Sequence, residues 1–345
     1  MQPEEKDELY EHHKFMVDRG QELMRMDKYL LNLIQNISRS KIQHAAKAGC
    51  VLVNGNPEKQ NYKVKPGDQI TILMPSPPRD IEIIPEDIPL EVPYEDEDLI
   101  IVNKPAGLVV HPAYGNYTGT LVNALIYRFQ GQTTKEGEPI RPLLVHRIDK
   151  NTSGIMVVAK NEEAQIKIAR EFYNHTVERK YWALVWGDFE EEQGTIIAKV
   201  GRNLKDRLMM ATFPDDSEYG KHAVTHWKVL ERFGYVTLIE CQLETGRTHQ
   251  IRVHMKSIGH PLFSDEVYGG DLVLKGTTFT KYKQFVKNCF ELMPRQGLHA
   301  KQLGLIHPTT EEVIFFDSEL PPDFQAVLEK WRNYAKHKGD LLFDE

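Results

Sequence analysis

The stretch that constrains the fold most is a polar loop at residues 146–154, between two apolar runs. It reads His-Arg-Ile-Asp-Lys-Asn-Thr-Ser-Gly, and residues 143–145 and 155–159 on either side are apolar. Short apolar runs bounded by turn residues predict buried strands, so we expect Asp149 on a loop between two core strands. A carboxylate on a rigid frame beside basic side chains is a candidate nucleophile or base. The same pattern also fits an aspartate that only caps a turn.

The composition limits the class of protein. A chain of 345 residues can form one large core or two unequal domains. No apolar run approaches the ~20 residues that cross a bilayer, and the acidic N-terminus does not predict a secretory signal. The three cysteines are far apart and fit neither a disulfide framework nor a zinc site: Cys50, Cys241 and Cys289. We therefore expect a cytoplasmic protein with no membrane contact.

Charge is unevenly distributed and predicts the domains. Residues 1–20 carry three basic and six acidic groups, an acidic extension. Residues 21–75 carry eight basic against four acidic groups, and residues 76–98 carry one against nine; residues 75–98 hold six prolines. A proline density of this kind predicts an extended linker, so a large domain is expected over 99–345. The basic segment permits contact with a polyanion despite the net charge of −7.

The basic segment has the pattern of a small α/β module. Residues 25–37 show helical spacing, Ser38 can cap a second helix over 39–48, and Asn54-Gly55 predicts a tight turn after a strand. This order resembles the αL-type RNA-binding domain of a small-subunit ribosomal protein. The resemblance implies RNA contacts on the second helix and nearby, by Arg25, Arg39, Lys41 and Lys47. An ordinary solvated helix face is the alternative.

The large domain is predicted to be α+β, with a large mixed, mainly antiparallel sheet and peripheral helices. Helices are expected over residues 118–129, 161–174, 247–256 and 324–338. A lysine-bearing stretch, residues 272–291, is expected to be a surface insertion.

Several familiar catalytic signatures are missing from the sequence. It has no Gly-x-Ser-x-Gly elbow, no phosphate loop, no His-Glu-x-x-His and no dinucleotide fingerprint after a strand. A serine hydrolase built on Ser153 and His146, or a metal hydrolase, would rest on isolated residues. We therefore expect neither a cofactor nor a metal.

Seven stretches together closely resemble the RluA/RluD family of pseudouridine synthases. They are residues 103–107, 146–149 with 152–154, 180–181, 243–254, 260–261, 265–269 and 298–300. The resemblance extends over nearly all of 90–320; Ile148 stands where leucine is usual. It implies the pseudouridine synthase fold and an isomerase that breaks the N-glycosidic bond of a uridine in RNA, turns the uracil and rejoins it through carbon 5.

The resemblance also implies roles for individual residues. Asp149 is the essential carboxylate, which attacks the sugar or the base or removes a sugar proton. Arg247 is expected against Asp149, with a surface salt bridge as the alternative. Tyr181 is expected to pack on the uracil, although a strand tyrosine is otherwise most often a core residue.

Because the target atom lies inside stacked RNA, the uridine must be turned out. Arg147 matches the arginine that fills the vacated space, and Lys180 and His146 are expected beside it, with His146 mainly shaping the loop. The N-terminal module favours large-subunit ribosomal RNA as the partner, and a monomer is expected. The alternatives are a synthase for transfer RNA or for both substrates, and a non-catalytic ribosome-assembly factor.

Overall fold

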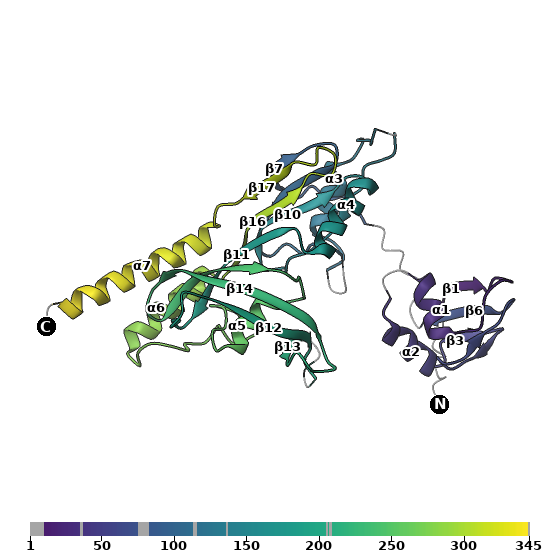
Figure 1. Ribbon diagram of the computed structural model, residues 1–345, viewed down its shortest axis with the longest axis horizontal. Helices are drawn as coiled ribbons and strands as arrows, with labels where there is room; N and C mark the ends of the chain where they lie inside the picture. Colours follow the sequence, from purple (N-terminus) through teal and green to yellow (C-terminus); the bar gives the residue numbers. More distant parts are fainter. Residues whose placement is uncertain are drawn as a thin grey trace, which may run out of the picture. The chain divides into compact units, whose positions relative to one another are not determined.

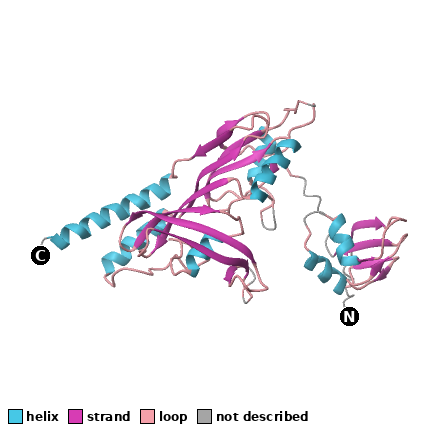
Figure 2. Ribbon diagram, in the orientation of Figure 1, coloured by secondary structure: helices cyan, strands magenta, loops and turns pink. Residues whose placement is uncertain are grey.

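The computed structural model describes residues 10–34, 37–74, 83–112, 116–135, 137–204, 206 and 209–343. They form two compact units, Met1–Glu82 and Ile83–Glu345, whose elements are labelled in Figure 1 and coloured by type in Figure 2. Residues 1–9 of the expected extension and residues 76–82 of the expected linker lie outside the described residues.

The smaller unit packs two helices against a small sheet. Its four-stranded sheet has the order β1-β6-β3-β4, and β2 pairs with β5 separately. The element bounds are β1 Tyr10–Met16, β2 Met24–Arg25, α1 Met26–Leu33, α2 Arg39–Lys47, β3 Val51–Val53, β4 Asn56–Pro57, β5 Lys63–Val64 and β6 Gln69–Met74. Ser38 caps α2 by accepting from the Lys41 N–H, and Asn54 and Gly55 take positive φ at the predicted turn. The extension was a wrong interpretation for residues 10–16, since these pair with β6.

The larger unit contains the remaining elements. They are β7 Glu91–Glu95, β8 Leu99–Lys104, α3 Leu121–Arg128, β9 Leu143–Leu144, β10 Ser153–Ala159, α4 Glu162–Asn174, β11 Glu178–Trp186, β12 Gln193–Arg202, β13 Met210–Phe213, β14 Lys221–Arg232, β15 Val236–Leu243, α5 Gln250–Ser257, α6 Thr280–Leu292, β16 Leu298–Ile306, β17 Val313–Asp317 and α7 Pro322–Phe343.

The large sheet has 11 strands, and its main path runs β13-β12-β14-β15-β11-β16-β10-β8-β7. The β10–β16 pair is parallel and the other described pairs in it are antiparallel, so the predicted mixed, mainly antiparallel sheet is confirmed. Side chains alternate along β11: Ala183 and Val185 face the core shared with α5, whereas Leu184 and Trp186 face the core built with α6 and α7. The pocket described below opens on the α5 face.

Two interpretations of the larger unit were wrong. The linker expected over 76–98 contains β7, which pairs with β8 at the end of the sheet path. An edge strand tolerates proline, and Pro93 lies where the register shifts between Glu91 and Tyr94. The expected surface insertion contains α6, whose Tyr282 and Val286 are buried against α7. In the part of the chain that is described, no helix is both long and apolar enough to span a bilayer.

Candidate active site

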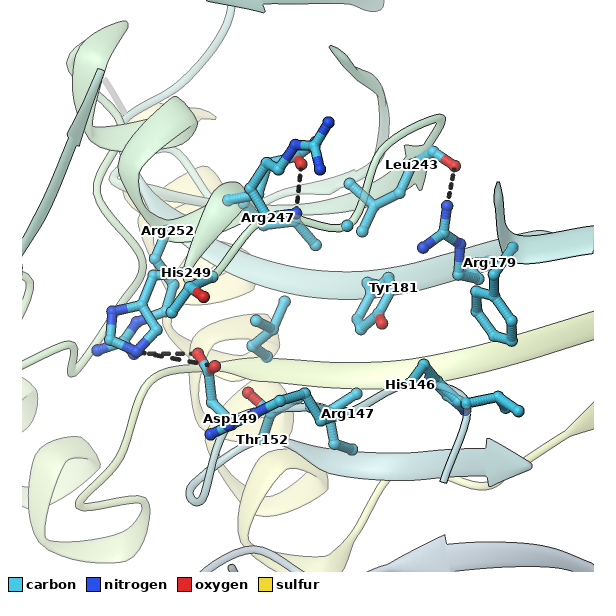
Figure 3. Close-up of a pocket in the computed structure, with 18 of the residues that line it drawn as sticks. His146, Arg147, Asp149, Thr152, Arg179, Tyr181, Leu243, Arg247, His249 and Arg252 are labelled. Carbon is cyan, nitrogen blue, oxygen red and sulfur yellow. Dashed lines mark hydrogen bonds and ion pairs between the residues drawn. The ribbon is translucent and has the colours of Figure 1, made fainter. Parts of the chain in front are cut away.

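A pocket of about 670 Å³ opens on the α5 face of the large sheet. Its walls come from five segments: the loop before β10, the end of α4, the start of β11, the β15–α5 connection with α5 itself, and the start of β16. Figure 3 shows Asp149, Tyr181 and Arg252 together in this pocket. The sequence prediction of Asp149 on a loop between two strands is confirmed, because that loop joins β9 to β10.

Buried groups hold the Asp149 loop from behind. The Lys104 ammonium is fully buried and donates to the carbonyl oxygens of Pro105, Leu108 and Lys150, at 2.9, 2.9 and 3.0 Å, which uses all of its protons. Arg295 donates to the Asn151 carbonyl at 3.1 Å. The carbonyl groups of Lys150 and Asn151, the two residues that follow Asp149, are therefore held in place. A side chain with a catalytic role requires a backbone fixed in this way.

Asp149 contacts Arg252 rather than Arg247. Its Oδ2 accepts from Arg252 Nη1 at 3.1 Å, and its Oδ1 lies 3.7 Å from His249 Nε2. The Arg247 guanidinium is turned away from Asp149 (Figure 3), and its Nε donates to the His222 carbonyl at 3.1 Å. The predicted pairing of Asp149 with Arg247 was therefore wrong, although both arginines line the pocket.

Arg247 does not pair with Asp149 because α5 begins later in the chain than we expected. We expected a helix from residue 247, but α5 starts at Gln250 after His249, which takes a left-handed φ of 56°. Arg247 therefore lies in the connection between β15 and α5, and Arg252 lies in the first turn of α5.

Arg252 is itself fixed by a second carboxylate. Its Nε and Nη2 donate to the two oxygens of Asp265 at 2.7 and 2.8 Å, and Asp265 is 1% exposed. Burial alone lowers the pKa of Arg252, but the hydrogen bond and charge of Asp265, followed by Asp149, raise it. A charged, immobile guanidinium thus faces Asp149 and fixes the direction of its carboxylate.

Burial keeps two neighbours of Asp149, His249 and Tyr181, uncharged. Burial lowers the pKa of His249 despite the charge of Asp149, and the His249 Nδ1 lies 2.7 Å from the Tyr268 hydroxyl. Tyr181 is 9% exposed, lines the pocket, and has its pKa raised by burial. The structure therefore brings Tyr181 and Asp149 together, as the sequence predicted.

The histidine and arginine before Asp149 differ in environment. His146 Nε2 accepts from the Val157 N–H at 3.0 Å, and its ring stacks on Phe172. Burial, and then the charge of Arg179, lower the pKa of His146 to about 3, so it is a neutral acceptor that holds the loop to β10. Arg147 is exposed on the pocket wall and makes no hydrogen bond or ion pair with a described residue.

Lys180 is not among the residues that line the pocket. It faces the other side of β11, where its ammonium lies 3.9 Å from Glu240, so an RNA contact by Lys180 would have to be made outside the pocket and stays a prediction. The residue that the prediction missed is Arg179, which lines the pocket with Tyr181. The alternation of a strand could have identified it, because residues two apart share a face.

The basic residues predicted in the smaller unit divide into two pairs. Arg25 and Arg39 both donate to the fully buried Asp27 carboxylate, at 3.0 and 2.9 Å; the Arg39 bond joins α2 to α1, and the Arg25 bond lies within the start of α1. Burial opposes ionisation of Asp27, but the hydrogen bonds from Arg25, Gln43 and Arg39 lower its pKa overall. Lys41 and Lys47 are exposed on α2.

One cluster outside the pocket has the composition of a metal site. Asp96, Asp98 and His307 bring their ligand atoms within 4.8 Å of one another. His307 Nε2 donates to Asp96 at 2.7 Å, while its Nδ1 accepts from the Thr309 and Thr310 N–H groups at 3.2 and 3.1 Å. Both ring nitrogens are thus engaged, and the cluster is explained as a tie between the start of β8 and the β16–β17 turn.

Comparison with known proteins identifies the family. Residues 98–257 match the family described as RNA pseudouridylate synthase, and residues 24–70 match the S4 domain. An uncharacterized RNA pseudouridine synthase of Chlorobaculum parvum is 47% identical over 92% of this chain and 96% of its own length. Ribosomal large subunit pseudouridine synthase D of Zymomonas mobilis is 42% identical over 88% of this chain and 92% of its own.

A solved structure has the same fold in the catalytic part. Human RNA pseudouridylate synthase domain containing 4 aligns with a TM-score of 0.55 and 25% identity, over 70% of this chain and 92% of that one. This chain matches nearly the whole length of both relatives. The residues that match the family, 98–257, include Asp149 and its loop. The chain is a member of the RluA/RluD family of RNA pseudouridine synthases, isomerases that here carry an N-terminal S4 domain.

Proposed function

We propose that this enzyme isomerises uridine in large-subunit ribosomal RNA, with Asp149 as the essential carboxylate. The observation that supports this most is the setting of Asp149. It is 22% exposed on the wall of a 670 Å³ pocket, bonded to a fixed guanidinium and accompanied by a buried tyrosine. Pockets of this size enclose ligands as large as a nucleoside.

The two oxygens of Asp149 can have different tasks. Oδ2 is held by Arg252 at 3.1 Å, whereas Oδ1 lies 3.7 Å from the neutral His249 and is the less constrained of the two. An ionised oxygen in this position can attack the sugar or the base, or take a proton from the sugar. Each route breaks the bond from the ribose to N1 and ends with a bond to C5; every heavy atom of the uridine stays in the product, while the C5 hydrogen is lost to solvent and N1 gains a proton.

A uridine must leave the RNA stack to reach Asp149, which costs a few kcal/mol. Arg147 is two residues before Asp149, exposed, and without a partner among the described residues. A planar guanidinium can stack on the bases that the uridine leaves behind. We therefore assign to Arg147 the filling of the vacated space and to Tyr181 the contact with the everted uracil.

The choice of ribosomal RNA rests on the S4 domain and on the relatives. Lys41 and Lys47 give α2 an exposed basic face suited to structured RNA, and several relatives of similar length are named ribosomal large subunit pseudouridine synthase D. The RNA would be held by the S4 domain while a uridine enters the catalytic pocket.

The test is tritium release from RNA transcribed with 5-tritiated uridine. We expect the purified protein to release tritium from large-subunit ribosomal RNA, and much less from small-subunit ribosomal or transfer RNA. Mapping pseudouridine in ribosomal RNA from cells with and without the gene should then identify the same sites. Release from transfer RNA alone would contradict the proposed substrate, and release from none of the three would contradict the proposed activity.

A further inference from the structure

Arg179 is a buried cation in the catalytic pocket that has no anion. Its residue exposure is 7%, and it forms no ion pair with any described residue. Two other arginines of the same unit, Arg252 and Arg295, are equally buried, and each binds both oxygens of an aspartate. Because an unpaired charge in a protein interior is strongly unfavourable, the difference suggests that the anion for Arg179 arrives with the substrate.

The hydrogen bonds of Arg179 leave much of the guanidinium unused. Nη2 donates to the carbonyl oxygens of Leu243 and Glu244 at 3.4 and 3.0 Å, while Nε has no partner among the described residues. A guanidinium offers five N–H donors. The ring of Phe172, 5.4 Å away, compensates the charge only in part, and burial lowers the pKa of Arg179.

The open side of this guanidinium is accessible from the pocket. Nη1 faces Gly246, where a Cβ atom would lie only 2.8 Å from it. Gly246 does not have a positive φ, so the backbone does not demand glycine there; the missing side chain instead lets Nη1 lie close to the Gly246 backbone at the pocket wall. The pocket wall as a whole carries four arginines, at 147, 179, 247 and 252, and Asp149 as its acidic residue.

We propose that Arg179 binds a backbone phosphate next to the everted uridine. This rests on the function proposed above and names a contact within it. Arg179 and Tyr181 are two residues apart on the same face of β11, and so about 7 Å apart along the strand. A uracil on Tyr181 can therefore have its own 5′ or 3′ phosphate toward Arg179, whose guanidinium can bind two phosphate oxygens at once.

The test combines a protein change with an RNA change. The probe is a stem–loop with one 5-tritiated uridine that the wild-type protein converts, made with a neutral methylphosphonate at the phosphate 5′ or 3′ of that uridine. Arg179→Gln keeps a donor for the carbonyl oxygens but removes the charge. We expect Arg179→Gln to raise KM about tenfold or more, as for loss of a charged hydrogen bond, and one methylphosphonate to do the same to the wild type.

The decisive quantity is the effect of both changes together. If Arg179 holds that phosphate, the methylphosphonate should change the KM of Arg179→Gln by less than about twofold, because the contact is already lost. The matched control is Lys180→Gln, the next residue on the other face of β11, which should keep the full methylphosphonate effect. Gly246→Ala, whose Cβ would clash with Nη1 and displace the guanidinium, should imitate Arg179→Gln with Arg179 present, and it provides a second test if Arg179→Gln does not fold.

The proposal is overturned if the two effects multiply at both phosphates, since Arg179 would then only support the backbone at Leu243 and Glu244. It is overturned equally if neither methylphosphonate affects the wild type. A wild-type protein that converts no RNA would instead contradict the proposed function, which is a distinguishable result.

Discussion

Arg252→Lys separates the arginine that the structure pairs with Asp149 from the one that the sequence suggested. The Nε and Nη2 atoms of Arg252 donate to the two carboxylate oxygens of Asp265 at 2.7 and 2.8 Å. Its third nitrogen, Nη1, donates to Asp149 at 3.1 Å. A lysine keeps the charge, but a single ammonium cannot reproduce this geometry. Losing the bond to Asp149 should cost about 1.5–3 kcal/mol, which lowers kcat by about 10- to 150-fold if the contact is needed in the transition state.

The assay is single-turnover tritium release at saturating enzyme, so that binding does not limit the rate. The matched control is Arg247→Lys, the same change at an arginine that contacts the His222 carbonyl instead; its kcat should remain close to wild type, whatever happens to KM. Folding is checked by tryptophan fluorescence, since the four tryptophans all lie in the catalytic unit. A wild-type kcat for Arg252→Lys together with a large loss for Arg247→Lys would refute the reasoning.

Three further predictions concern stability and RNA binding. Burial lowers the pKa of His254 and of His299 to about 4, whereas a histidine in the unfolded chain has a pKa of about 6.5. Below pH 6.5 the unfolded chain therefore binds more protons than the folded one, and the free energy of unfolding should fall by about 2 kcal/mol for each histidine from pH 7 to pH 5. Urea unfolding of His299→Asn should show a smaller difference between these two pH values. Changing Lys41 and Lys47 together to alanine should reduce the slope of log Kd against log salt by about 2 for structured RNA without altering the melting temperature; an unchanged slope would remove the proposed role of that face. Gly154 has φ +116°, and a Cβ there would lie 2.2 Å from a backbone oxygen, so Gly154→Ala should lower the melting temperature by several degrees or prevent folding, and a wild-type melting temperature would contradict the strand packing described.

The Asp149 loop could be predicted from the sequence because its signals are local. Two apolar runs around a polar turn predict two strands, and this places Asp149 at their junction; β10 is buried along its whole length, whereas β9 is short and half-buried. Tyr181 could be placed in the pocket only through the family resemblance, since a strand tyrosine by itself indicates a core position.

The partner of Asp149 could not be predicted, because it depends on where a helix starts. Arg247 and Arg252 are five residues apart in one polar segment, and the left-handed His249 decides which of them enters α5. Arg179 was overlooked for a different reason: its neighbour Lys180 was chosen as the basic residue, although strand alternation puts Lys180 and Tyr181 on opposite faces.

The domain boundaries were obscured by composition. Proline and acidic residues predict a linker over 76–98, yet an edge strand such as β7 needs few donors and tolerates both. The first strand of the smaller unit was hidden in the same way, because β1 lies at the end of its sheet and its charged residues suggested an extension.

The measurement that tests the central claim most directly is tritium release by Asp149→Asn. The asparagine keeps the volume of the side chain but has no charge with which to attack or to take a proton. We predict no release above background under single-turnover conditions, with RNA affinity and tryptophan fluorescence close to those of the wild type. Release at the wild-type rate would show that Asp149 is not the essential carboxylate.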